Sequence, residues 1–169
     1  MSGTHRFALP RSFVLLGLVF LAAAAGCTAV AIIEKQPSLL LSAGFFVAII
    51  LYGVLARPRI SGSTLHVGLK SRDLSAGGRA AFRAYTYRYN GIKAQRKVQL
   101  VFIDPKGSKM ALNISSPGKL VHRPVDYAAL SAVMRANPNM AEMATELDSV
   151  VNGSSGRRAD MYKRLAGRR

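Results

Sequence analysis

SFVLLGLVFLAAAAGCTAVAII (residues 12–33) and LLLSAGFFVAIILYGVLA (residues 39–56) are the two stretches that determine the architecture of this chain. Neither contains a charged residue or a proline. At about 1.5 Å per residue, the first stretch forms roughly 33 Å of helix, which is enough to cross a hydrocarbon core of about 30 Å. The second stretch lies near the lower limit of length for a span. The sequence therefore predicts two transmembrane helices.

The linker between these stretches contains only residues 34–38, and its Pro37 ends the first helix. We therefore expect a tight antiparallel hairpin over residues 12–56. No acidic or basic side chain lies within either stretch, so a proton relay or an ion pathway has no residues to use. A transporter or a channel is disfavoured for this reason.

Small residues recur at four-residue spacing in both stretches, Ala22 with Gly26 and Gly44 with Ala48. Such pairs let two helix backbones approach closely, because helix association in lipid depends on packing. Alanine and glycine are also common on lipid-facing surfaces, so this second interpretation stays open.

Cys27 follows Ala24-Ala25-Gly26, and this run resembles the lipobox of bacterial lipoproteins, whose cysteine is lipidated after signal cleavage. Two features depart from that pattern. Position 24 is Ala where the family usually has Leu, and the apolar run continues to Ile33. Lipidation of Cys27 is therefore the alternative, and a small buried residue is the main interpretation.

Basic residues flank the outer ends of the predicted hairpin. Arg6 and Arg11 precede the first span, Arg57 and Arg59 follow the second, and the loop between the spans is neutral overall. Because positive residues stay on the cytoplasmic side, the sequence predicts a multi-pass protein of the cell membrane (inner or plasma membrane) with both termini in the cytoplasm. Residues 1–11 are then a basic N-terminal tail.

Half of the 169 residues are hydrophobic, yet the chain carries 24 Lys and Arg against 8 Asp and Glu, a net charge of +16. The charge gathers after the hairpin, since residues 57–123 hold 14 basic and two acidic residues. We expect a basic cytoplasmic α+β domain over residues 57–152 and a basic flexible tail over residues 153–169. One cysteine excludes an intrachain disulfide framework and a cysteine-based zinc module.

Four segments after the hairpin have the alternation or turn signals of β-strands. In Ala81–Tyr89, Phe82, Ala84 and Thr86 alternate with Arg83 and three tyrosines, and Asn90-Gly91 is a strong hairpin signal. Asp104-Pro105-Lys106-Gly107 marks a second turn. We predict at least four antiparallel strands, over residues 63–70, 81–89, 92–103 and 109–114.

The pattern changes to helical spacing after residue 123. Asp126 is predicted to cap a helix over residues 126–136, and a second amphipathic helix is predicted from Met140 to Val151. The run VQLVFIDPKGSKMALNI (98–114), followed by DYAALSAVMRA (126–136), resembles the bacterial two-span membrane proteins that carry a pleckstrin-homology-like domain. The resemblance implies an antiparallel sheet or partly open seven-stranded barrel, capped by a C-terminal helix, with no catalytic residues.

Residues with catalytic or metal-binding chemistry are sparse. His5, His66 and His122 have no metal-ligand spacing, and the strand region offers only Asp73 and Asp104 as carboxylates, both in expected turns. No nucleotide-binding, hydrolase or metalloprotease motif occurs. The sequence predicts neither an enzyme nor a cofactor or metal site.

The basic surface is the remaining functional signal. We interpret the protein as a membrane-anchored scaffold or adaptor whose domain contacts anionic lipid headgroups or an acidic protein partner. Nucleic-acid binding is the alternative, with Tyr85, Tyr87 and Tyr89 as a stacking face, and a merely solvated basic surface also stays open. The candidate anion-binding residues are Arg83, Arg88, Lys93, Arg96, Lys97, Lys106 and Lys109.

Overall fold

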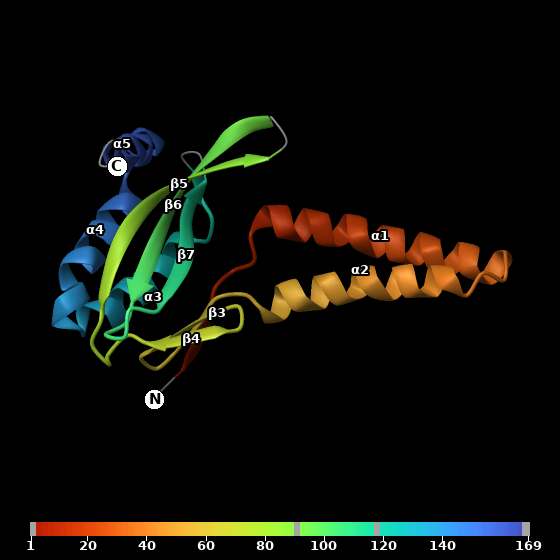
Figure 1. Cartoon of the computed structure of the whole chain (residues 1–169), viewed down its shortest axis with the longest axis horizontal. Coiled ribbons are helices and arrows are strands. Elements are labelled where there is room, and N and C mark those ends of the chain that lie inside the picture. Colours follow the sequence, from red (N-terminus) through yellow and green to blue (C-terminus); the bar gives the residue numbers. More distant parts are fainter. Residues whose placement is uncertain (1–2, 90–91, 117–118, 167–169) are drawn as a thin grey trace. The chain divides into compact units, whose positions relative to one another are not determined.

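The computed structural model describes residues 3–89, 92–116 and 119–166 (Figure 1). The chain forms two compact units. We call one the helical hairpin, which consists of Leu9–Arg57, and the other the domain, which combines the residues up to Ala8 with those from Pro58 onward.

The helical hairpin consists of α1 (Arg11–Ile33) and α2 (Ser38–Leu55). Both helices are long and apolar enough to cross a membrane, as the sequence predicts, and most of their large side chains point outward. The two helices approach where Gly53 faces the ring of Phe13, because a Cβ on residue 53 would lie 2.0 Å from that ring. The rings of Phe20 and Phe46 also pack, with centroids 5.5 Å apart.

The predicted small-residue pairs do not form the contact between α1 and α2. A Cβ added at Gly26 or Gly44 would meet nothing within 4 Å, and Ala22 and Ala48 are exposed. The lipid-facing interpretation of these pairs fits this arrangement.

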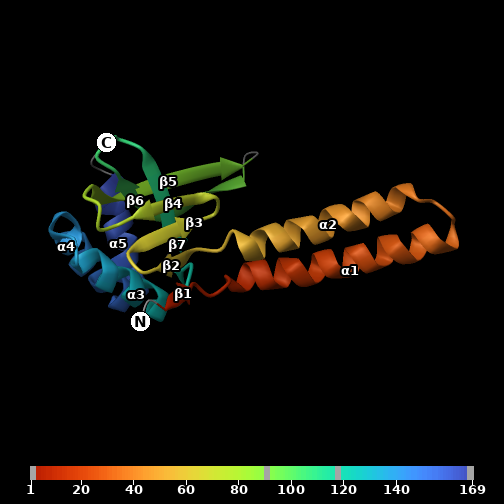
Figure 2. The ribbon, with the colours of Figure 1, turned by 90° about the horizontal axis from the view of Figure 1, so that it is seen from below.

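The domain contains two antiparallel sheets in which each strand pairs with the next along the chain. The first sheet consists of β1 (Thr4–Arg6), β2 (Arg59–Ser61), β3 (Thr64–Val67) and β4 (Lys70–Asp73). The second sheet consists of β5 (Arg79–Tyr89), β6 (Ile92–Ile103), β7 (Lys109–Ser116) and β8 (Lys119–Leu120). Figure 2 shows β2–β4 beside β5–β7.

Helices complete the domain and share one core with both sheets. They are α3 (Pro124–Arg135), the short 3₁₀ helix η1 (Pro138–Met140), α4 (Ala141–Asn152) and α5 (Ser155–Ala166). The inward residues of the second sheet, such as Leu100 and Leu112, are buried with Leu65 of the first sheet and with Leu130 and Leu147 of the helices. The prediction of a helical hairpin followed by a small α+β domain is thus confirmed.

The structure differs from the sequence-based expectations in several local details. The expected strand 63–70 is a hairpin, because Gly68 adopts a φ of +62° and turns the chain between β3 and β4. Asp126 is the third residue of α3, and its carboxylate accepts the backbone N–H of Arg123, which is the N-cap residue. The expected flexible tail contains α5, whose Met161 is buried in the core. The predicted Asn90-Gly91 turn lies outside the described residues.

The N-terminal segment, expected as a tail, is part of the domain. β1 pairs with β2 in the register Thr4↔Ser61, His5↔Ile60 and Arg6↔Arg59. Phe7 is completely buried, and its backbone N–H donates to the carbonyl oxygen of Pro58 at 3.0 Å. The helical hairpin is therefore an insertion between two neighbouring strands of one sheet.

Removing the Phe7 ring should show that this segment stabilises the domain. We expect Phe7→Ala to lower the free energy of unfolding by about 3–5 kcal/mol, because it leaves a cavity in a closed core. Chemical unfolding of the full chain in neutral detergent, followed by near-ultraviolet circular dichroism, measures the change. Thr4→Ala, at an exposed neighbouring position, is the control and should stay near the wild-type value. A Phe7→Ala protein as stable as this control would contradict the assignment.

Candidate functional site

The outward face of the second sheet is basic. Arg79 and Arg83 are exposed on β5 and alternate with the buried Ala80 and Ala84. The register continues this face onto Lys97 of β6 and Lys109 of β7. Among the described outward positions of β5, β6 and β7 there is no acidic residue. We call this surface, made by Arg79, Arg83, Lys97 and Lys109, the basic sheet face.

The amide side chains at the centre of this surface are paired with each other. Gln99 Nε2 donates to Asn113 Oδ1 at 2.9 Å, on neighbouring positions of β6 and β7. Because the two amides bond to each other, the basic side chains around them are the groups that can bind an anion. The basic sheet face can therefore attract negative charge, and the described side chains at its outward positions include no carboxylate, histidine, cysteine or hydroxyl group.

The structure brings three of the seven predicted anion-binding residues, Arg83, Lys97 and Lys109, onto one face. Lys106 is exposed in the turn between β6 and β7. The side chains of Arg88, Lys93 and Arg96 lie outside what the structure describes, as do those of the three tyrosines of the nucleic-acid alternative.

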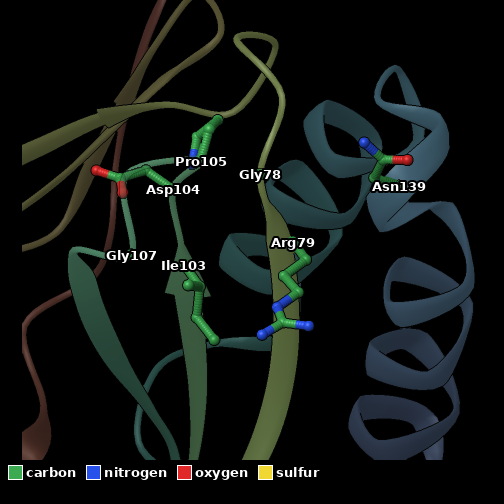
Figure 3. A pocket seen from close by; sticks show the side chains of 7 residues that line it. All are labelled: Gly78, Arg79, Ile103, Asp104, Pro105, Gly107 and Asn139. Carbon is green, nitrogen blue, oxygen red and sulfur yellow. The ribbon is translucent and has the colours of Figure 1, made fainter.

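A shallow pocket lies at one end of β5 and β6 (Figure 3). Its volume is about 570 Å³, and its polar side chains are Arg79, Asp104 and Asn139. The carboxylate of Asp104 is already engaged, because Arg72 Nη2 donates to Oδ2 at 3.1 Å and the Ser108 N–H donates to Oδ1 at 2.7 Å. Asp104 therefore stabilises the β6–β7 turn, and no nucleophile, histidine or second carboxylate lines the pocket.

A second polar cluster joins the N-terminal segment to the start of α3. Asp126 is buried and accepts three hydrogen bonds, from His5 Nε2 at 3.0 Å and from the N–H groups of Ala8 and Arg123 at 3.1 Å each. Three donors satisfy a buried carboxylate that would otherwise be costly to desolvate. This cluster fixes residues 5–8 against the domain.

His122 holds the same segment from the other side. Its Nδ1 lies 3.0 Å from the carbonyl oxygen of Ala8, which can only accept, so the proton of a neutral ring resides on Nδ1. Burial lowers the pKa of His122, against the smaller opposing effects of its bond to Ala8 and of the charge on Asp126. The Phe7 ring packs edge-on at 5.2 Å from the His122 ring.

Tyr127 completes this cluster. Its hydroxyl accepts from the His122 N–H at 3.1 Å and donates to the Ile114 carbonyl at 3.0 Å, and burial raises the pKa of the phenol. The carboxylate of Asp126, Nε2 of His5, Nδ1 of His122 and the hydroxyl of Tyr127 all have hydrogen-bond partners within the domain, so this cluster is a structural anchor. The sequence alone did not indicate it. The aspartate three residues after an N-cap position was the one available signal.

Cys27 is half-buried in α1. Cleavage before Cys27, which lipidation requires, would remove β1 and Phe7 from the domain. Within the described residues, no group of three or more His, Cys, Asp or Glu side chains is placed to hold a metal ion.

Comparison of the chain with protein-family models, with curated proteins and with solved structures gives no match. The pleckstrin-homology-like resemblance remains a prediction.

The buried His122 should make the stability of the domain depend on pH. Because its pKa is lowered in the fold, the unfolded state binds more protons, and stability should fall as pH drops below about 6.5. His122→Asn retains an N–H donor for Ala8 but removes the titrating ring. We expect the loss of stability between pH 7.5 and 5.5, measured by thermal unfolding, to be smaller in His122→Asn. An equal loss in both proteins would exclude His122 as the cause.

Proposed function

We propose that this chain is an integral membrane protein with two spans and both termini in the cytoplasm. Two apolar helices of sufficient length support the spans. The pairing of β1 with β2 adds an independent argument, because the chain leaves the domain after β1 and returns at β2. A compact domain lies wholly on one side of a bilayer, so both ends of the hairpin must be on that side. The arginines around these ends favour the cytoplasm.

On this membrane anchor, the protein acts as a non-enzymatic scaffold or adaptor whose domain binds anionic lipid headgroups. The observation that supports this proposal most directly is the basic sheet face, with four basic residues and no acidic residue at its described outward positions. Each Lys or Arg near an anionic leaflet adds about 1 kcal/mol of attraction before screening by salt. The two chain connections to the hairpin keep the domain at the surface, so weak attraction becomes effectively intramolecular.

An acidic protein partner would use the same charges, and single-stranded nucleic acid is the remaining alternative.

An enzyme is the rival class of function. Three described groups that could do chemistry, Asp104, Asp126 and His122, each have structural partners. Turnover that is abolished by one polar substitution in a folded protein would support the rival class.

The topology can be tested with single cysteines in a Cys27→Ala background. We expect Gln36→Cys, in the loop between the helices, to react with a membrane-impermeant maleimide in intact cells. Ala76→Cys, which is exposed in the loop after β4, should react only after permeabilisation. Labelling of Ala76→Cys in intact cells would contradict a cytoplasmic domain, and labelling of both positions would contradict a spanning hairpin.

Lipid binding can be tested by hydrogen exchange of the full chain in nanodiscs. We expect the β5 and β6 amides to exchange more slowly when anionic lipid replaces neutral lipid, because bound headgroups shield the strands. Arg83→Gln with Lys97→Gln should remove this protection. Arg135→Gln with Lys163→Gln, two exposed positions on α3 and α5, is the charge-matched control.

Protection that does not depend on Arg83 and Lys97 would contradict the proposed site. Short single-stranded DNA added to the nanodiscs tests the alternative, which stronger protection by DNA than by anionic lipid would favour.

A further inference from the structure

The strand register identifies the end of the first sheet at which the chain connects to the two apolar helices. Arg6 pairs with Arg59, Arg59 pairs with His66, and Val67 pairs with Lys70. The last residues of β1, the first of β2 and the turn between β3 and β4 therefore share one end of the sheet. The chain passes to α1 just after β1 and returns from α2 just before β2. The β3–β4 turn is thus at the end of the sheet from which both spans depart.

Leu69 occupies the tip of this turn. Its relative exposure is 92%, which is higher than that of the other large hydrophobic residues in the described chain that face solvent. The positive φ of Gly68 produces a tight turn, so the leucine projects beyond the strands instead of folding back onto the core. An exposed leucine is ordinary by itself. At the tip of a tight turn, on the end of the sheet where the chain connects to both helices, it is available to enter the interface of the bilayer.

Two arginines lie directly opposite each other at the same end. Arg6 and Arg59 are cross-strand neighbours on the outer face, and both are exposed. Like charges in this position destabilise a sheet. Within the described residues neither guanidinium has an ion-pair partner, and the exposed Lys70 adds a third positive charge beside the turn. A phosphate placed between the guanidinium groups would neutralise this repulsion and accept paired hydrogen bonds.

We infer that this end of the first sheet is a membrane-docking edge, with Leu69 inserted at the headgroup–acyl boundary and with Arg6 and Arg59 bound to lipid phosphates. The inference rests on the proposed function, because it requires α1 and α2 to span the bilayer. It adds a defined docking edge to the basic sheet face, which lies on the other sheet. The spans bring the lipid to this edge, which is why we assign the anion to a lipid headgroup.

The experiment uses the full chain in nanodiscs that contain anionic lipid, with an environment-sensitive fluorophore on a single cysteine. The labelled position is Leu69→Cys in the Cys27→Ala background, and nitroxide lipids quench probes near the headgroups. We expect quenching at position 69 to be severalfold stronger than at Ala76→Cys, which is exposed beyond the opposite end of β4. Equal quenching at the two positions would overturn the inference.

The arginines are tested in the same labelled protein. Arg6→Gln with Arg59→Gln should reduce the quenching at position 69, whereas Arg6→Lys with Arg59→Lys should retain most of it. In neutral detergent the glutamine variant should be at least as stable as the parent, because it relieves the repulsion between the two charges. Quenching that survives the glutamine substitutions, or that is lost equally with Arg79→Gln and Arg83→Gln, would overturn the role of these two arginines.

A probe on the native Cys27 separates this inference from the proposed function. Lipids that carry a nitroxide deep in the acyl chain should quench it if α1 spans the bilayer. Quenching at Cys27 without quenching at position 69 would overturn only the docking edge. Absence of quenching at Cys27 would overturn the spanning hairpin, and the docking edge with it.

Discussion

The carboxylate of Asp126 holds together two parts of the domain that are far apart in the sequence, residues 5–8 and the start of α3. It accepts from His5 and Ala8 before the first apolar helix and from the backbone of Arg123 at the start of α3. With the buried Phe7 ring, these bonds keep β1 in the first sheet although β1 has only three residues. The insertion of the helical hairpin between β1 and β2 depends on this anchor, and so does the proposed placement of both ends of the hairpin on one side of a membrane.

Much of the architecture could be predicted because its signals are local. The apolar helices are visible as uninterrupted runs, and the alternation of Arg83 with Phe82 and Ala84 correctly assigns the two faces of β5. β1 could not be predicted in this way. Its partner strand β2 follows both helices in the sequence. In addition, three residues are too few to show an alternation of polar and apolar side chains that would distinguish a strand from a tail. α5 was also missed, because its high positive charge conceals the two apolar residues, Met161 and Leu165, that pack against the core.

The candidate site, like the fold, could be predicted from the sequence only in part. Basic residues on an alternating strand could be assigned to one surface from the sequence, since the side-chain period of a strand is fixed. The roles of His5 and His122 could not, because the structure gives both of them partners more than 100 residues away, Asp126 and Ala8. The opposed pair of Arg6 and Arg59 also becomes visible only when the register of β1 on β2 is known.

The insertion of the hairpin within a sheet has a consequence for biosynthesis. β1 is made first, but its partner β2 emerges from the ribosome only after both apolar helices have been synthesised. The Phe7 side chain packs against Tyr127 and other core residues that are synthesised even later. It can therefore be buried only after these residues have emerged. The domain can therefore fold completely only after the segments on both sides of the hairpin have been synthesised. With the proposed topology, a nascent chain whose second helix did not insert would keep β2 apart from β1 and leave the domain incompletely folded.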